Sequence, residues 1–422
     1  MKIVYFNYIS NAIGPMIRTL EIAKACSDNN IYVVLHFMRK DFNPPEFIFD
    51  RIREYQGEKL KIYFPPIHDT SLNSQSNETM HSVNVAPMPP KMSAFGLLRQ
   101  GLLSLRYIFQ EIKIIHYEKP DAIMARPDDA FSFCFSGKIT KTPIVLDTDG
   151  PVEELDLYWG VYSKYFKIFD SFRARSSNAV LCISRVCRDL WIDKQLDIKK
   201  LFIVPNGANP DEFSPQASEQ RKILKLKNKL DGSRVIGFSG NQRVWHGLPN
   251  LLISSLVHLK ANKDIKLLII GCGKNIKMLE ECNIPDKIIK NQIIFTGQLS
   301  YTDMAKYIDL ADIMVMPYDI LKLFYFSPMR MFEAMSAGKL LITSKQGQMQ
   351  DILGEQSAVI FFDPEKEGDL ERILGNAIYD DELIATGVRN RDYLLASHTW
   401  KHRGQEISNA LIYAINDNYT KS

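Results

Sequence analysis

Short apolar segments that suit β-strands alternate with helical patterns along nearly the whole chain, in two successive runs. Strands joined by helical crossovers form a parallel sheet covered on both faces, and such strands are short and continuously apolar. The pattern therefore predicts an α/β protein with two doubly wound domains. Strands are predicted at residues 3–7, 32–36, 61–64, 122–125, 144–147, 180–183 and 202–204 in the first run, and at 235–239, 267–270, 293–295, 313–316, 340–343 and 359–361 in the second.

A chain of 422 residues has ample length for two cores. Pro, Gly and Asn cluster between Pro205 and Pro215, so the hinge is predicted there. We expect a first domain of residues 1–207 and a second of 208–399. An amphipathic helix remains within residues 400–422 after the second sheet is complete, and it is predicted to cross back to the first domain.

Composition points to an ordinary globular protein. With 52 basic and 49 acidic residues, the charge is too balanced to suggest nucleic acid as a partner. The six cysteines form no C-x-x-C pair and the eight histidines no H-E-x-x-H motif. We therefore expect free thiols in a reducing compartment, no metal site and no cofactor.

The chain shows no secretory signal and no apolar stretch long enough to span a bilayer, so a cytoplasmic location is expected. Residues 94–115 are the most apolar long segment, but charged residues interrupt it. This pattern is typical of an amphipathic helix. Its apolar face would either bury in the protein or lie on a membrane surface.

The segment FYFSPMRMFEAMSAGKL is the most informative one for function. It is predicted to be a helix entered from a strand, with Ser327 as the N-cap and Pro328 in the first helical position. The backbone N–H groups of Met329 and Arg330 would then be free donors at a positive helix end. Such an end suits a phosphate group.

Glu333 follows the predicted cap by six residues, about 9 Å at 1.5 Å per residue. This is roughly the distance from a diphosphate to a ribose. The alternative is an ordinary amphipathic helix with Met331, Phe332 and Met335 in the core.

Glycines follow several of the predicted strands and precede helices. A glycine lets the backbone approach a bound anion closely, and several such loops favour a ligand of nucleotide size. Neither a G-x-G-x-x-G fingerprint nor a P-loop is present. The glycines concerned are Gly14, Gly240, Gly271, Gly273 and Gly297.

Charged residues in two loops are further candidates. Arg243 could donate two hydrogen bonds to a diphosphate or be a solvated loop residue, and His246 could bind phosphate or cap a helix. Asp149 lies in an acidic loop after a first-half strand. It could bind sugar hydroxyls or accept a proton, or simply favour the start of the next helix.

Several segments together resemble the family-4 retaining glycosyltransferases of the GT-B fold. The resemblance is good over about residues 175–365 and looser before them. It rests on VLCISRVCRDL (180–190), VPNGANPDEFSP (204–215), VIGFSGNQRVWHGLPNLL (235–252), LLIIGCGK (267–274), IIFTGQLS (293–300) and FYFSPMRMFEAMSAGKL (324–340).

The resemblance implies transfer of a sugar from a nucleotide diphosphate donor, with retained anomeric configuration and without a metal. Glu333 matches the second Glu of the family's E-x7-E motif, which holds the donor ribose. Ser327 to Met329 would lie at the diphosphate or sugar, and Gly14 at the diphosphate.

The chain departs from the family pattern at three places. Tyr325 stands where the first Glu of the motif would be. Asn241 and His246 replace the usual basic pair, so that Arg243 or Arg330 would have to supply the charge. Asp149 is a positional candidate where the family has an acceptor-domain histidine.

Three functions remain open from the sequence. The first is a glycosyltransferase acting on a lipid-linked or polysaccharide acceptor, with possible peripheral contact with the inner membrane face. The second is a nucleotide-sugar 2-epimerase of the same fold, which would turn over the donor without an acceptor. The third is a non-catalytic subunit that binds a UDP- or GDP-sugar.

Overall fold

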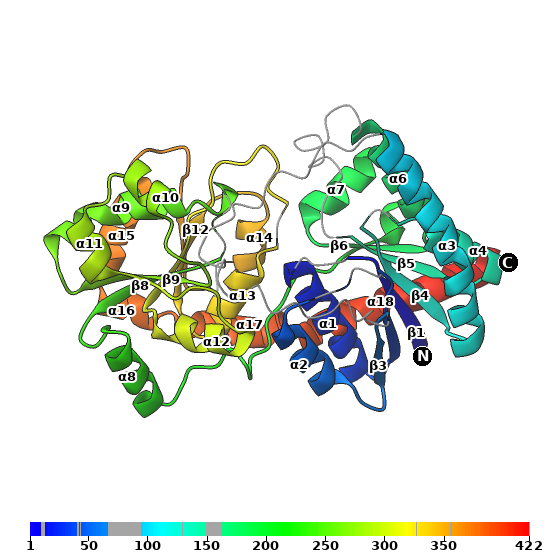
Figure 1. The fold of residues 1–422 in the computed structure, drawn as a ribbon, viewed down its shortest axis with the longest axis horizontal. Helices are drawn as coiled ribbons and strands as arrows, with labels where there is room; N and C mark the ends of the chain where they lie inside the picture. Colours follow the sequence, from blue (N-terminus) through cyan, green and yellow to red (C-terminus); the bar gives the residue numbers. More distant parts are fainter. Residues whose placement is uncertain are drawn as a thin grey trace, which may run out of the picture.

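Each run of strands forms one wholly parallel sheet in the computed structural model (Figure 1). The structure describes the chain except for residues 10–12, 40–41, 43, 66–93, 129, 149–162, 241, 243, 326, 355–356 and 422. Every predicted strand is present, and the two doubly wound domains are confirmed. The 7-stranded sheet has the order β3-β2-β1-β4-β5-β6-β7 and the 6-stranded sheet β10-β9-β8-β11-β12-β13.

The strands end within one or two residues of the predicted positions. Those of the first sheet are β1 (Lys2–Asn7), β2 (Tyr32–Phe37), β3 (Leu60–Tyr63), β4 (Ala122–Arg126), β5 (Ile144–Thr148), β6 (Ala179–Cys182) and β7 (Leu201–Ile203). Those of the second sheet are β8 (Arg234–Ser239), β9 (Ile265–Ile270), β10 (Ile293–Phe295), β11 (Ile313–Met316), β12 (Leu340–Ser344) and β13 (Val359–Phe362).

Helices cover both faces of each sheet. In the first half they are α1 (Ile13–Asp28), α2 (Glu46–Tyr55), α3 (Ala94–Glu118), α4 (Ser132–Thr140), α6 (Ser163–Ser176), α7 (Arg185–Asp193) and the short η3 (Ile198–Lys200). In the second half they are α8 (Ser218–Lys227), η4 (Val244–His246), α9 (Leu248–Ala261), α10 (Ile276–Glu281), α11 (Asp286–Gln292), α12 (Tyr301–Leu310), α13 (Met329–Ser336), α14 (Met349–Leu353), α15 (Asp369–Ile378), α16 (Asp381–Ala385), α17 (Val388–Ser397) and α18 (Trp400–Lys421).

The chain passes between the two sheets at two segments that lie side by side. Ala208 and Thr399 form a parallel β-bridge, and the Ala208 N–H donates to the His398 carbonyl at 3.4 Å. A Cβ on Gly207 would lie 2.9 Å from that carbonyl oxygen, so the two crossings pack tightly. The first crossing coincides with the predicted hinge. We keep the divisions at 207/208 and 399/400 as proposed domain boundaries.

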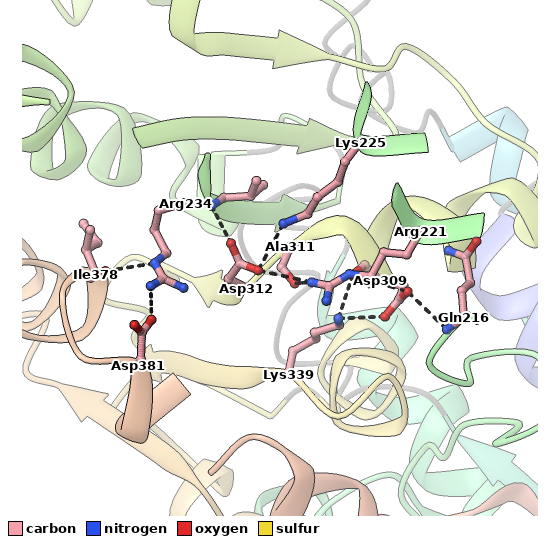
Figure 2. Close-up of polar contacts among 11 residues, drawn as sticks. Gln216, Arg221, Lys225, Arg234, Asp309, Ala311, Asp312, Lys339, Ile378 and Asp381 are labelled. Atoms are coloured by element: carbon pink, nitrogen blue, oxygen red, sulfur yellow. Dashed lines mark hydrogen bonds and ion pairs between the residues drawn. The ribbon is translucent and has the colours of Figure 1, made fainter. Parts of the chain in front are cut away.

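A charged cluster attaches the chain after the hinge to the second sheet (Figure 2). Lys339 Nζ lies 2.7 Å from Asp309 Oδ1, and Asp312 accepts from Arg221 at 3.1 Å and Lys225 at 3.4 Å. Asp312 and Lys339 immediately precede β11 and β12, so the cluster lies at the amino ends of the strands. Ligands of such sheets bind at the carboxyl ends, and we therefore give the cluster a structural role.

The last helix, α18, returns to the first sheet as predicted and packs against α1 and β6. Figure 1 shows it running from the second domain along the first (red). The expected apolar face is the buried one: Ile407, Ala410, Leu411 and Ala414 are fully buried.

Close packing of α18 on α1 generates a stability prediction. A methyl group on Gly404 would overlap the Ala25 carbonyl and the Asn29 side chain, so Gly404→Ala must push the helices apart. We expect a loss of about 1–3 kcal/mol in the free energy of unfolding, seen as a lower melting temperature. Gly57→Ala is the matched control, because nothing lies within 4 Å of its added Cβ. Equal melting temperatures for the two variants would contradict the packing.

Candidate functional site

The amino ends of α1 and α13 meet between the two domains. Gly14 is the second residue of α1, and a Cβ on it would lie 3.7 Å from Cε of Met329, the first residue of α13. Both helix ends carry a positive partial charge and N–H groups that lack helical acceptors. Two positive helix ends separated by little more than the Met329 side chain favour an anion beside them. The structure therefore brings together the two residues that the sequence assigned to a diphosphate.

The predicted cap of α13 was wrong by one residue. Pro328, rather than Ser327, is the N-cap residue, and no side chain caps this helix. The Ser327 hydroxyl instead accepts a hydrogen bond from the backbone N–H of Asn206 at 2.9 Å. The Ser327 carbonyl accepts a second hydrogen bond from the side-chain amide of Asn206. The linker between the domains competes with the helix for this hydroxyl. Ser327 and Pro328 thus position α13 by attaching it to the linker.

Glu333 holds Arg330 in place. The Glu333 side chain is fully buried, and its two oxygens accept from the Tyr301 hydroxyl at 2.7 Å and from Arg330 Nη1 at 2.6 Å. Burial is the largest influence on the pKa of Arg330 and would lower it, but the Glu333 charge and hydrogen bond, together with Tyr301 and Tyr318, raise this pKa overall. Arg330 is therefore a permanent cation one residue inside the amino end of α13. Ribose binding by Glu333 stays a prediction.

Glu333 also belongs to an interdomain ion network that the sequence did not suggest. Arg51 of α2 donates through Nε to Glu21 at 2.8 Å and through Nη2 to Glu212 at 2.6 Å, and its guanidinium stacks on the Tyr301 ring at 4.4 Å. Burial raises the pKa of Glu21 although Arg51 opposes the shift. These side chains come from five separate parts of the chain, and no motif or spacing connects them.

The glycine loops after β8 and β9 touch each other, as predicted for strands that end at one edge of a sheet. A Cβ on Gly271 would lie 3.8 Å from the Gly240 carbonyl oxygen, and one on Gly240 would lie 3.1 Å from His246 Nδ1. The His246 ring stands edge-on to Tyr318, with centroids 6.0 Å apart. The Gly273 carbonyl accepts a hydrogen bond from a side-chain amide in the loop after β8, and this bond joins the two loops.

Gly247 fixes the position of His246. It has φ +67° at the start of α9, a conformation that favours glycine. A Cβ there would overlap the Pro317 carbonyl. The close approach of Gly247 to Pro317 was not predicted, because the two residues lie far apart in the sequence.

The remaining candidates are less informative. The Gly297 N–H donates to the Cys272 carbonyl at 3.1 Å, which places Gly297 beside the loop after β9. Asn241, Arg243 and Asp149 lie outside the described residues. Their predicted roles stay predictions.

Tyr325 is buried between the domains. It belongs to an apolar cluster that also contains Val4, Phe6 and Tyr8 from β1 and the residues that follow it, although Tyr325 comes from the second half of the chain. Partly buried Leu323 packs against the same cluster. The loop before α13 therefore reaches across to the first domain, and Tyr325 contributes packing there. Its predicted contact with the donor stays a prediction.

Asp147 lies at the carboxyl end of β5 and is fully engaged. It accepts from the Tyr5 hydroxyl at 2.7 Å and from Arg126 at 2.6 Å, and Arg18 Nη2 lies 3.3 Å away. Burial would raise the pKa of Asp147, but Arg126 and Arg18 outweigh it and lower the pKa. Arg18 also donates to Asn206 Oδ1 at 2.7 Å. Asp147 is thus a fixed charge that orders the linker, not a proton acceptor.

No group of three or more His, Cys, Asp or Glu side chains in the described part of the chain is arranged to hold a metal ion. The predicted independence from metal remains a prediction.

Residues 219–386 match the family described as glycosyl transferases group 1. Among curated proteins, none matches the chain.

The fold is that of GT-B glycosyltransferase structures. Anabaena HepE in complex with UDP and glucose has a TM-score of 0.69 at 14% identity, over 98% of this chain and 99% of that one. Sucrose-phosphate synthase from Thermosynechococcus elongatus has a TM-score of 0.70 at 12% identity, over 100% of both chains. UDP-GlcNAc 2-epimerase from Neisseria meningitidis is also similar, with a TM-score of 0.57 at 14% identity over 98% of this chain and 100% of that one.

The interdomain ion network predicts a large difference between two arginines of α2. Arg51→Met would leave the buried Glu21 without its cation, and breaking such a pair costs about 3–5 kcal/mol. Arg53→Met removes an exposed arginine that pairs with exposed Glu46 and Asp50, and should leave the melting temperature close to that of wild type. Thermal unfolding of both variants measures the difference. Similar melting temperatures would contradict a role for Arg51 in joining the domains.

Proposed function

We propose that this protein is a glycosyltransferase that moves a sugar from a nucleotide diphosphate donor to an acceptor, with retention of anomeric configuration. The observation that best supports this proposal is that the amino ends of α1 and α13 approach each other at Gly14 and Met329, beside the charged Arg330. The match of residues 219–386 to glycosyl transferases group 1 supports the reaction class. UDP in the HepE structures supports a UDP-sugar, with a GDP-sugar as the other donor to test.

The proposed donor pose follows from the helix ends. The diphosphate lies between Gly14 and Met329, where backbone N–H groups and Arg330 offset its negative charge as it leaves. Glu333, one turn further along α13, is then within reach of the ribose. The glycines after β8 and β9 leave room for the nucleotide at the carboxyl edge of the second sheet.

A binding subunit is the second candidate, because Tyr325 stands where the resemblance places a glutamate and is buried. The epimerase reading is weaker, since the epimerase structure has a lower TM-score than HepE. For the acceptor we propose a lipid-linked or polysaccharide glycan, reached from the cytoplasmic side of the inner membrane.

Turnover assays separate these functions. We expect release of nucleotide diphosphate from a UDP- or GDP-sugar only when a glycan acceptor is present, with unchanged rates in excess chelator because Arg330 and the helix ends supply the positive charge. Activity lost in chelator and restored by Mg²⁺ or Mn²⁺ would contradict metal independence. Formation of a 2-epimer without acceptor indicates an epimerase, and binding with no turnover indicates a subunit.

Glu333→Gln tests whether this carboxylate binds ribose or acts only through Arg330. A lost ribose contact should weaken UDP binding about tenfold, roughly 1.4 kcal/mol, and leave pyrophosphate binding intact. Arg330→Gln is the comparison variant, since it should weaken both ligands. Calorimetric titration gives the two dissociation constants. Equal weakening of UDP and pyrophosphate by Glu333→Gln would make Glu333 a positioning residue for Arg330.

A further inference from the structure

Large apolar side chains are exposed together on the outer surface of the first domain. The most exposed are Phe109 of α3 at 74% and Ile168 of α6 at 66%. We call this surface the outer apolar patch; its members are Leu105, Phe109, Phe135, Ile139, Ile168, Phe169 and Phe172.

The patch is one surface rather than scattered residues. The Phe135 and Phe172 rings lie 5.6 Å apart and join α4 to α6, and α3 packs against α4. All three helices cover the same face of the first sheet, where their inward residues share one apolar cluster. Figure 1 shows them on the side of the first domain that is remote from the second domain.

A buried carboxylate fixes which side of α3 faces outward. Glu111 is fully buried and accepts three hydroxyl hydrogen bonds, from Tyr8 at 2.6 Å, Ser136 at 2.7 Å and Ser132 at 2.5 Å. Because these bonds hold one side of the helix against the domain, the opposite stripe is directed to solvent. That stripe contains Leu105, Phe109, Lys113 and Tyr117, at intervals of four residues.

The charges around the patch have one sign. The exposed charged side chains on the described parts of α3, α4 and α6 are Arg106, Lys113, Lys138 and Arg175. Of the acidic residues on these helices, Glu111 and Asp170 are buried, and Glu118 is half-buried and pairs with Lys2.

Each of three phenylalanines has a basic residue one helical turn further on. The pairs are Phe109 with Lys113, Phe135 with Lys138, and Phe172 with Arg175. In the loop before α4, exposed Asp128 pairs with Arg39. The patch therefore combines apolar side chains with a complement of cations.

We propose that the outer apolar patch docks on an anionic membrane surface. Aromatic and aliphatic side chains would enter the boundary of the lipid headgroups, and the basic side chains would contact lipid phosphates. In the described part of the chain, no helix has the length and apolar character needed to cross a bilayer, so this contact is peripheral. A second copy of the chain is a poorer occupant, because a twofold contact would place the same cations against each other.

Membrane docking would bring the protein to a lipid-linked acceptor, and only this consequence rests on the proposed function. The surface itself is defined by Phe109, Phe135, Phe172 and their basic neighbours, away from Gly14 and Met329.

Vesicle flotation tests the proposal with the full chain. Wild type should bind vesicles that contain phosphatidylglycerol and not vesicles of phosphatidylcholine alone. Phe109→Ser with Ile168→Ser should weaken binding roughly tenfold or more, since two large apolar side chains would no longer be buried in the lipid boundary. The control is Ile223→Ser with Ile276→Ser, which removes two exposed isoleucines of the second domain (56% and 61%) and should bind as wild type.

Charge reversal tests the basic residues in the same assay. Lys113→Glu with Lys138→Glu should abolish the preference for phosphatidylglycerol, whereas Lys260→Glu with Lys277→Glu in the second domain should not. Absence of wild-type binding, or equal loss in the control variants, would overturn the proposal. So would a dimer in sedimentation velocity that the Phe109 and Ile168 changes dissociate, because the patch would then be a protein interface.

The donor site is measured separately, by thermal stabilisation with UDP. All patch variants should keep the wild-type stabilisation. If wild type is not stabilised by UDP or GDP, the proposed function is in doubt while the flotation result stands.

Discussion

A single buried carboxylate, Asp147, determines where the two domains meet. It pairs with Arg126 and with Arg18. Arg18 then holds the linker residue Asn206, and Asn206 holds Ser327 at the entrance to α13. Buried ion pairs add little net stability, because desolvation offsets their attraction, but breaking one is costly. The chain of contacts therefore fixes geometry more than it stabilises the fold. It places the amino end of α13 against α1, on which the proposed donor site depends.

The interdomain ion network constrains the same region from the other side. Arg51 in the first domain bonds Glu212, which lies in the hinge segment, and stacks on Tyr301 of the second domain. In the closed arrangement these charges are desolvated. If the domains separated, water would solvate these charges, and this hydration would offset part of the lost Coulomb energy. The free energies of the closed and the separated arrangement therefore differ by less than the number of contacts suggests. A small difference suits a cleft that must admit and release a ligand.

Sequence patterns predicted the sheets and the crossing helix, which follow from the period of apolar residues. The approach of Gly14 to Met329 did not follow from any pattern, and only the family resemblance assigned both residues to a diphosphate. The cap of α13 was misplaced because Ser327 bonds a linker that lies 121 residues away in the chain. The network around Arg51 and the packing of Tyr325 were not predicted either. Both arise where distant segments meet, and local spacing carries no information about such contacts.

The position of Tyr325 and the charge of Arg330 are connected. The resemblance places a glutamate at Tyr325 and basic residues where Asn241 and His246 stand, so the chain has lost one negative and some positive charge relative to that pattern. Arg330 restores a cation at the helix end, and it stays charged and oriented because Glu333 lies 2.6 Å away. A glutamate at position 325, in the loop before the same helix, would add a negative charge near this cation and compete for it. An aromatic residue packed against the first domain adds none, and it leaves the positive charge of Arg330 to the diphosphate.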